Sequence, residues 1–210
     1  MGGARARPGT AAGGPAGRPG FSPEWLALSE EIRACERCSL HRTRTQGVVY
    51  RGAPQPKLLF VGEAPGAEED RIGLPFVGRS GRMLDAGVAQ LGLLPEEFGV
   101  LNLLKCRPPK NRFDPTAAAC CRPYLDRQLA LLRPEVIVTL GARALSALDR
   151  SALPVTRSAG TARPWGSLRL FPMLHPAATF RATRYRERWD RDLRALGREL
   201  GGWHRTAKPL

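Results

Sequence analysis

The chain has 210 residues, a length that suits one domain with a short tail, and its 42% hydrophobic and 25% charged residues are ordinary for a globular protein. This composition excludes a wholly disordered chain and a membrane bundle, because no apolar run reaches the roughly 18 residues of a spanning helix. The 33 Lys and Arg residues against 19 Asp and Glu give a formal net charge of +14. Such a charge favours a polyanionic partner, although a genomic bias towards arginine would produce the same excess.

The first segment, residues 1–23, is rich in Gly, Pro and Arg and has no acidic residue. Such a composition cannot bury enough apolar surface to offset the entropy of ordering, so we expect a disordered basic tail, either a solvated leader or an arm that tethers DNA. The segment lacks the apolar stretch of a secretory signal, which predicts a cytoplasmic protein. We expect the folded domain to span residues 24–199 and residues 200–210 to form a short C-terminal tail.

A helix is predicted to begin after this tail. Ser22 can cap its first turn, and Pro23 suits the first helical position. Apolar residues from Trp25 to Ile32 then recur at helical spacing, and the helix runs into Cys35.

Beyond this helix, apolar runs alternate with helical patterns. The runs predict buried strands over residues 58–61, 100–104, 136–140 and 168–174. The helical patterns cover residues 80–91, 116–132, 142–149 and 182–199. This alternation predicts an α/β fold with parallel strands joined by crossover helices.

Five cysteines are present: Cys35, Cys38, Cys106, Cys120 and Cys121. A reducing compartment disfavours a disulfide framework, so ligation is the better hypothesis. The C-x-x-C pair together with Cys106 and one of the two adjacent cysteines would supply four soft thiolates, which suit zinc or an iron-sulfur cluster.

Chemically distinctive residues follow the predicted strands, and ligands of open α/β sheets gather at this edge. GEAPGAEED at 62–70 and LPFVG at 74–78 follow the first strand. Asn102 interrupts the second strand and precedes KCRPPKNR at 105–112, and HPAATFR at 175–181 follows the fourth. These segments are therefore the candidates for a functional site.

Taken together, the motifs resemble those of the family 4 uracil-DNA glycosylases, the iron-sulfur branch of the uracil glycosylase superfamily. The resemblance covers residues 24–199 and rests on C-x-x-C, GEAPG-x-x-ED, LPFVG, N-x-x-KCRPP-x-NR, CRPYL and HPAA in this order. It implies a three-layer α/β/α sandwich around a four-stranded parallel sheet. It also implies hydrolysis of the N-glycosidic bond of uracil in DNA, which leaves an abasic site, and the motifs contain no evident lyase lysine.

The resemblance further implies a 4Fe-4S cluster. Matching the motifs assigns its ligation to Cys35, Cys38, Cys106 and Cys121, because Cys121 begins CRPYL. Cys120 remains the alternative fourth ligand. The cluster is expected to be structural, because no partner redox motif is present.

The expected reaction requires a uracil turned out of the base stack. Phe76 in LPFVG would supply a stacking platform. Asn102 would read the pyrimidine edge by accepting from N3–H and donating to O4, a pattern that cytosine reverses. His175 would donate to uracil O2 and stabilise the anionic leaving base. Gly62 and Ala64 are expected to line the same site.

The attacking water requires a carboxylate. Glu63 would orient the water and stabilise the sugar cation, with Glu69 as a second catalytic candidate. Alternatively, Glu69 or Asp70 holds the water and Glu63 shapes the loop. The resemblance also implicates Asn111, without separating these roles.

Two further segments are expected to contact DNA. Arg79 and Ser80 open a predicted helix whose first backbone N–H groups can hold a phosphate. Residues from Ala177 onwards would fill the gap left by the extruded nucleotide, with Phe180 or Arg181 as the wedge.

Uracil-containing DNA is therefore the expected partner of a monomeric enzyme. The rival hypothesis is a non-catalytic module in which an iron-sulfur cluster or a zinc ion organises a basic DNA-binding surface. The presence of Glu63, Asn102 and His175 favours the enzyme, because a binding module does not require them.

Overall fold

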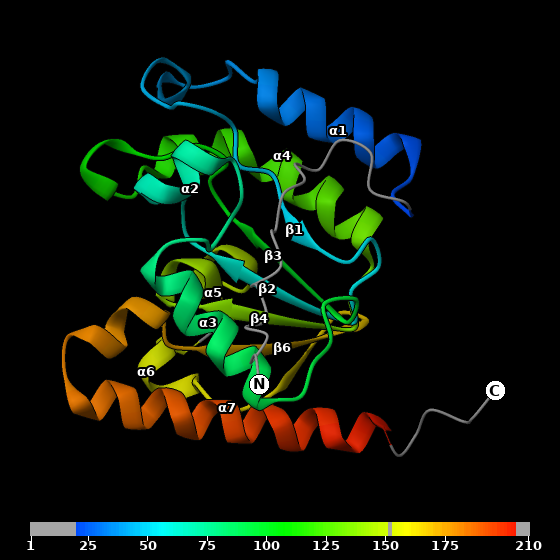
Figure 1. Cartoon of the computed structure of the whole chain (residues 1–210), viewed down its shortest axis with the longest axis vertical. Coiled ribbons are helices and arrows are strands. Elements are labelled where there is room, and N and C mark those ends of the chain that lie inside the picture. The colour runs from blue at the N-terminus through cyan, green and yellow to red at the C-terminus, as the bar shows by residue number, and fades with distance from the viewer. Residues whose placement is uncertain (1–19, 151–152, 205–210) are drawn as a thin grey trace, which may run out of the picture.

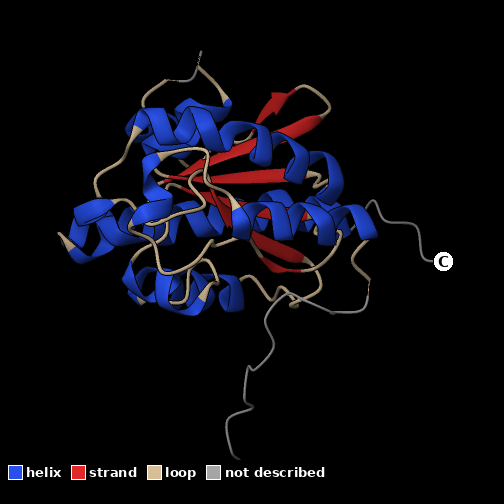
Figure 2. Cartoon of the chain, turned by 90° about the horizontal axis from the view of Figure 1, so that it is seen from above, coloured by secondary structure: helices blue, strands red, loops and turns tan. Residues whose placement is uncertain are grey.

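The computed structural model describes residues 20–150 and 153–204, and in it helices cover both faces of one sheet (Figures 1 and 2). The strand order is β1-β3-β2-β4-β6-β5. The strands are β1 (Arg51–Gly52), β2 (Leu58–Gly62), β3 (Phe98–Asn102), β4 (Val136–Leu140), β5 (Arg163–Trp165) and β6 (Leu168–Met173). The central four strands are parallel, as predicted, and the short edge strands β1 and β5 pair antiparallel.

Strand β3 begins and ends two residues earlier than predicted. Its register pairs Leu58 with Phe98 and Gly62 with Asn102. Leu103 and Leu104 continue the apolar run, but their N–H groups donate to the carbonyls of Gly62 and Glu63, where β2 gives way to its loop. The apolar run therefore extends past the end of β3. Asn102 is the last residue of the strand and lies at the edge of the sheet where β2 also ends.

The helices agree with the predicted pattern and add two short ones. They are α1 (Pro23–Ala34), α2 (Ala67–Ile72), α3 (Arg79–Gln90), α4 (Pro115–Leu132), α5 (Ala142–Leu148), α6 (Val155–Ser158) and α7 (Thr183–His204), with 3-10 turns η1 (Ser39–Arg42), η2 (Pro109–Asn111) and η3 (Pro176–Phe180). The predicted cap of α1 is confirmed, because Ser22 Oγ accepts from Trp25 N–H at 3.2 Å. None of the helices in the described ranges is both long and apolar enough to cross a membrane.

Helix α7 continues five residues beyond the predicted end at 199. Residues 1–19 of the predicted tail at 1–23 and residues 205–210 of the predicted tail at 200–210 lie outside the described residues, so the domain limits stay a prediction.

Each face of the sheet carries its own core. Alternate strand residues such as Leu59 and Ile137 pack against α1, α4 and α5, whereas Phe60 and Val138 pack against α3 and α7. Figure 1 shows α1 and α4 on one side of the sheet and α3 and α7 on the other. This is the predicted three-layer sandwich, and it brings the carboxyl ends of β2, β3 and β6 to one edge.

Candidate active site

A cavity of about 520 Å³ lies at this edge of the sheet. It brings together most of the predicted site residues: Glu63, Ala64, Glu69, Phe76, Arg79, Ser80, Asn102, Asn111, His175, Ala177 and Arg181. Of the remaining predicted residues, Gly62 lies against Asn102 and Phe76, and Phe180 lies against Arg79. Segments more than 100 residues apart in the sequence therefore form one pocket.

The Asn102 side chain is the most unusual polar group of this cavity. It is 1% exposed, and within the described residues neither Oδ1 nor Nδ2 has a hydrogen-bond partner. A buried polar group without a partner costs about 1–3 kcal/mol, and proteins satisfy most such groups. An amide left in this state at the end of β3 is arranged to bind a ligand with one donor and one acceptor.

Phe76 forms part of the cavity wall near this amide. Its φ of 55° is the left-handed conformation, which is strained for a bulky residue. A Cβ at Gly62 would overlap Asn102 Oδ1 and lie 2.5 Å from the Phe76 ring, and a Cβ at Gly81 would overlap the Phe76 carbonyl. Glycine at both positions therefore allows the strained aromatic residue to enter the cavity wall.

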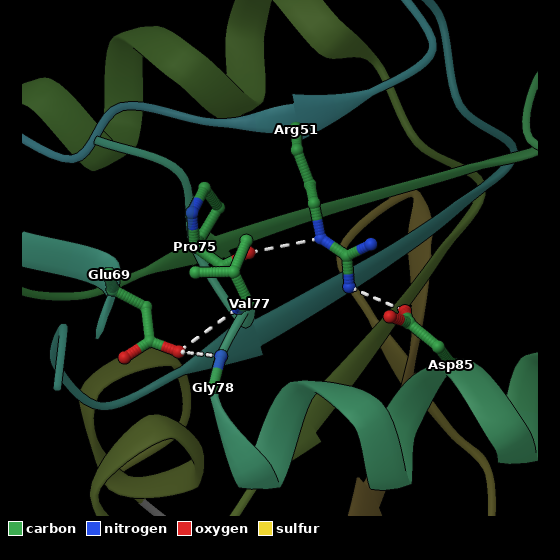
Figure 3. A network of polar contacts seen from close by, with 6 residues as sticks. All are labelled: Arg51, Glu69, Pro75, Val77, Gly78 and Asp85. Carbon is green, nitrogen blue, oxygen red and sulfur yellow. Dashed lines mark hydrogen bonds and ion pairs between the residues drawn. The ribbon is translucent and has the colours of Figure 1, made fainter. Parts of the chain in front are cut away.

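Phe76 belongs to the loop at 73–78 between α2 and α3, which we call the Phe76 loop. Arg51 holds this loop from one side (Figure 3). Its Nε donates to the Pro75 carbonyl at 3.0 Å, and its Nη2 pairs with Asp85 Oδ1 of α3 at 2.6 Å. The guanidinium thus joins β1, the loop and α3. Sequence reasoning missed Arg51 and Asp85, because no local pattern distinguishes them among the many charged residues.

Glu69 holds the same loop from the opposite side (Figure 3). Its Oε1 accepts from the N–H groups of Val77 at 3.0 Å and Gly78 at 2.8 Å, and its Oε2 accepts from Gly66 N–H at 3.0 Å. The carboxylate is thus bound by backbone donors of two loops. The Gly78 N–H at the start of α3 is occupied by Glu69.

Asp70 and Glu63 differ sharply in their surroundings. Both Asp70 oxygens accept from Thr45, at 2.8–3.1 Å, and Asp70 does not line the cavity. Glu63 lines the cavity, and its carboxylate has no hydrogen bond or ion pair in the part of the chain that is described. Burial raises the pKa of Glu63, and the charge of Arg143 partly opposes this effect. Glu63 is therefore the acidic side chain best placed to hold a water molecule.

His175 follows β6 and faces the Phe76 ring, with 5.8 Å between the ring centroids. Its Nδ1 accepts from Ala177 N–H at 3.1 Å, which leaves the proton on Nε2. Burial, helped by the charge of Arg181 and partly opposed by that of Glu69, lowers the pKa of His175 to about 4. His175 is thus a neutral imidazole with an N–H donor at neutral pH.

The residues predicted to contact DNA lie together at the rim of the cavity. The Arg79 guanidinium lies over the Phe180 ring, 3.8 Å from its centroid, and joins α3 to η3. Phe180 is 37% exposed, a high value for a large apolar side chain, and Arg181 and Ala177 lie beside it on the cavity wall.

Three of the five cysteines gather at a small apolar cluster that includes Leu104, just after β3. Cys106 and Cys121 are buried in a small cluster with Leu40 and Ala117, and Cys38 packs against this cluster. All five cysteines are free thiols. No group of three or more Cys, His, Asp or Glu side chains in the described ranges is placed as the ligands of a single metal ion.

Electrostatic interactions link four of these thiols. Burial raises the pKa of Cys106, Arg44 lowers it, and Cys38 and Cys35 raise it. Burial also raises the pKa of Cys121 to about 11, with Lys105 opposing and Cys106 and Cys38 adding to this effect.

Comparison with known proteins agrees with this geometry. The family model described as "Uracil DNA glycosylase superfamily" matches residues 49–195. The chain is 39% identical over 184 residues to a type-4 uracil-DNA glycosylase of Archaeoglobus fulgidus, covering 83% of this chain and 92% of the relative. It is 40% identical over 157 residues to a type-4 uracil-DNA glycosylase of Thermotoga maritima, covering 73% of this chain and 82% of the relative. A type-5 uracil-DNA glycosylase of Thermus thermophilus is 37% identical over 113 residues, 46% of this chain and 51% of that relative.

Proposed function

The chain belongs to the uracil-DNA glycosylase superfamily and, within it, to the type-4 enzymes, and from this premise we propose that it hydrolyses the N-glycosidic bond of uracil in DNA and leaves an abasic site. The observation that carries the proposal is the buried, unpartnered Asn102 amide in one cavity with Phe76 and His175. A purely DNA-binding module would have no use for such a pocket.

Base recognition would depend on the orientation of the Asn102 amide. Its Oδ1 accepts from uracil N3–H, and its Nδ2 donates to uracil O4. Cytosine presents the opposite pattern and would leave both amide groups buried without partners, at about 1–3 kcal/mol each. The Phe76 ring stacks on the base, while Gly62 and Ala64 leave room for it.

Bond cleavage would depend on His175. Its Nε2–H donates to uracil O2, where negative charge develops as the bond to the sugar breaks. A neutral donor suits this role, because its hydrogen bond strengthens with the developing charge and so stabilises the transition state more than the bound substrate.

The water would be held by Glu63. The free carboxylate of Glu63 accepts a proton from the water and stabilises the positive charge on the sugar. Glu69, the second catalytic candidate, acts instead by fixing the Phe76 loop through its three backbone partners. Asp70 is bound to Thr45 and does not line the cavity, so we assign it no role in holding the water.

DNA would lie across the rim of the cavity. Arg79 and Ser80 contact phosphates, and Ala177, Phe180 and Arg181 fill the gap left by the uracil. The excess of basic residues is consistent with a polyanionic partner such as DNA. The monomeric state and the cytoplasmic location stay predictions.

A 4Fe-4S cluster is the proposed cofactor, with Cys35, Cys38, Cys106 and Cys121 as its ligands. The donor set fits the cluster, because all four groups are soft thiols and influence one another electrostatically. As thiolates, the four sulfurs would bind the iron of the cluster. When bound, the cluster supplies a structural cross-link.

The direct test uses a duplex oligonucleotide with one uracil. Incubation followed by alkali should cut the strand at the uracil, and matched duplexes with cytosine or thymine should stay intact. Asn102→Asp should lose selectivity against cytosine or lose activity. An intact uracil strand with the wild-type protein would refute the proposed function.

A further inference from the structure

Arg79 lies at the rim of the cavity without a polar partner. It is the first residue of α3 and is exposed. Within residues 20–150 and 153–204 its guanidinium forms no hydrogen bond or ion pair, and it lies instead over the Phe180 ring, 3.8 Å from the centroid. A guanidinium over an aromatic ring is held through its flat face, so this contact uses none of its five N–H donors. Arg79 therefore offers unpaired donors to a ligand at the cavity mouth.

Phe180 stands outside the apolar cores of the described chain. Its side chain is 37% exposed and belongs to none of the three buried clusters. It is the last residue of η3, a turn that is held from within, because Thr179 Oγ1 donates to the Pro176 carbonyl at 2.7 Å. The ring thus projects from a fixed turn, and Arg79 anchors it to α3.

Phe180 also has the chemistry of a wedge. Side chains that enter between stacked bases are typically apolar, and they offset the cost of unstacking. Phe180 is the large apolar side chain exposed on η3, whereas Thr179 bonds within the turn and Arg181 carries a charge. Of the two wedge candidates, Phe180 and Arg181, the geometry therefore favours Phe180.

The two surfaces of the Arg79 guanidinium are independent. Its edge can bind a phosphate while its face packs on the ring, because the group is planar and its donors lie in the plane. The backbone beside it is fixed as well, since the Gly78 N–H donates to Glu69 at 2.8 Å. A phosphate bound by Arg79 would therefore take up a defined position relative to Phe180.

We propose that Arg79 is a positioning residue that couples DNA binding to base extrusion: its N–H donors bind a phosphate of the DNA backbone while its face sets the Phe180 ring in the gap that the uracil leaves. This inference rests on the proposed function. It assigns the gap to Phe180 rather than to Arg181, and it makes phosphate binding and the placement of the wedge properties of one side chain.

The experiment measures extrusion separately from excision. The probe is a duplex in which 2′-fluoro-2′-deoxyuridine lies next to the fluorescent base 2-aminopurine. The fluorine destabilises the sugar cation, so the glycosidic bond stays intact, and extrusion of the uracil unstacks 2-aminopurine and raises its fluorescence. At saturating protein, Arg79→Met should lower the extrusion equilibrium by about 2- to 5-fold, as expected for one exposed cation–π contact. Titrations at several salt concentrations should show the loss of about one phosphate contact.

Arg82→Met is the matched control, because it removes an exposed cation three residues further along α3. It should leave extrusion at the wild-type level. Phe180→Ala should lower the extrusion equilibrium by about 10-fold, and Arg181→Met should lower it less. The double variant Arg79→Met with Phe180→Ala should be no lower than Phe180→Ala alone, because Arg79 acts on extrusion through the ring.

Each part of the proposal has its own contradicting result. Equal losses in Arg79→Met and Arg82→Met, or additive losses in the double variant, would overturn the coupling. Normal extrusion in Phe180→Ala, or a larger loss in Arg181→Met, would overturn the wedge assignment. An unchanged salt dependence in Arg79→Met would overturn the phosphate contact. A wild-type protein that does not excise uracil from an unmodified duplex would instead refute the proposed function itself.

Discussion

The protonation state of His175 gives the sharpest prediction about the chemistry. With a pKa of about 4, about 1% of His175 carries a proton at pH 6, whereas a histidine at the ordinary value near 6.5 would be about three-quarters protonated. If the neutral ring is the active form, its contribution to catalysis is constant from pH 8 down to about pH 5.5. The contribution should be lost only as the pH falls through about 4.

The assay is the single-turnover excision rate of the wild-type protein divided by that of His175→Ala, measured from pH 4 to pH 8. Division removes the titration of Glu63, whose raised pKa makes both proteins lose rate on the acid side before an ordinary glutamate would. A ratio that rises or falls with a midpoint near 6.5 would contradict the neutral-donor mechanism.

The same lowered pKa affects stability with a definite sign. Between about pH 6.5 and 4 the unfolded chain takes up a proton on His175 that the folded chain refuses, so acidification destabilises the fold over this window. The largest effect is about 3 kcal/mol, and no further loss from this residue is expected below pH 4. Urea unfolding of the wild-type protein and His175→Ala at both ends of the window would measure it.

Three other substitutions test the arrangement of the site. Gly62→Ala places a methyl group against the Phe76 ring. It should lower the rate of uracil excision by about 10²-fold and leave the DNA affinity unchanged. A normal excision rate would show that the base does not occupy this space. Arg51→Met removes the bond to the Pro75 carbonyl and should lower the free energy of unfolding, measured with urea, by about 1 kcal/mol. It should also misplace the Phe76 loop and weaken uracil binding, measured by inhibition with free uracil. Cys121→Ala should remove the absorbance near ~400 nm whereas Cys120→Ala should keep it, and the reverse outcome would make Cys120 the ligand.

Local patterns predicted the central strands and the long helices well, because their apolar residues repeat with a clear period. The edge strands at Arg51–Gly52 and Arg163–Trp165 were missed, since two or three half-exposed residues carry no period. They form because the neighbouring strands offer unpaired backbone groups, which is a tertiary effect.

The candidate site residues were found through motifs, whereas the roles proposed for them depend on contacts that only the structure shows. Nothing in the spacing of Glu63, Glu69 and Asp70 indicates which carboxylate is free, because this depends on N–H groups of loops distant in sequence. Lys105 stood inside a recognised motif without a role. Its burial, with Nζ donating to the Asn102 carbonyl, becomes visible only in the folded chain.

The strained backbone at Phe76 has a consequence for inhibitor discovery. Since intrachain bonds to Arg51 and Glu69 hold the aromatic wall in place, the cavity proposed to bind uracil should keep its shape without contacts from the duplex. The released product should therefore re-enter by itself and slow turnover, and flat heterocycles of similar size are rational starting points for small-molecule fragments.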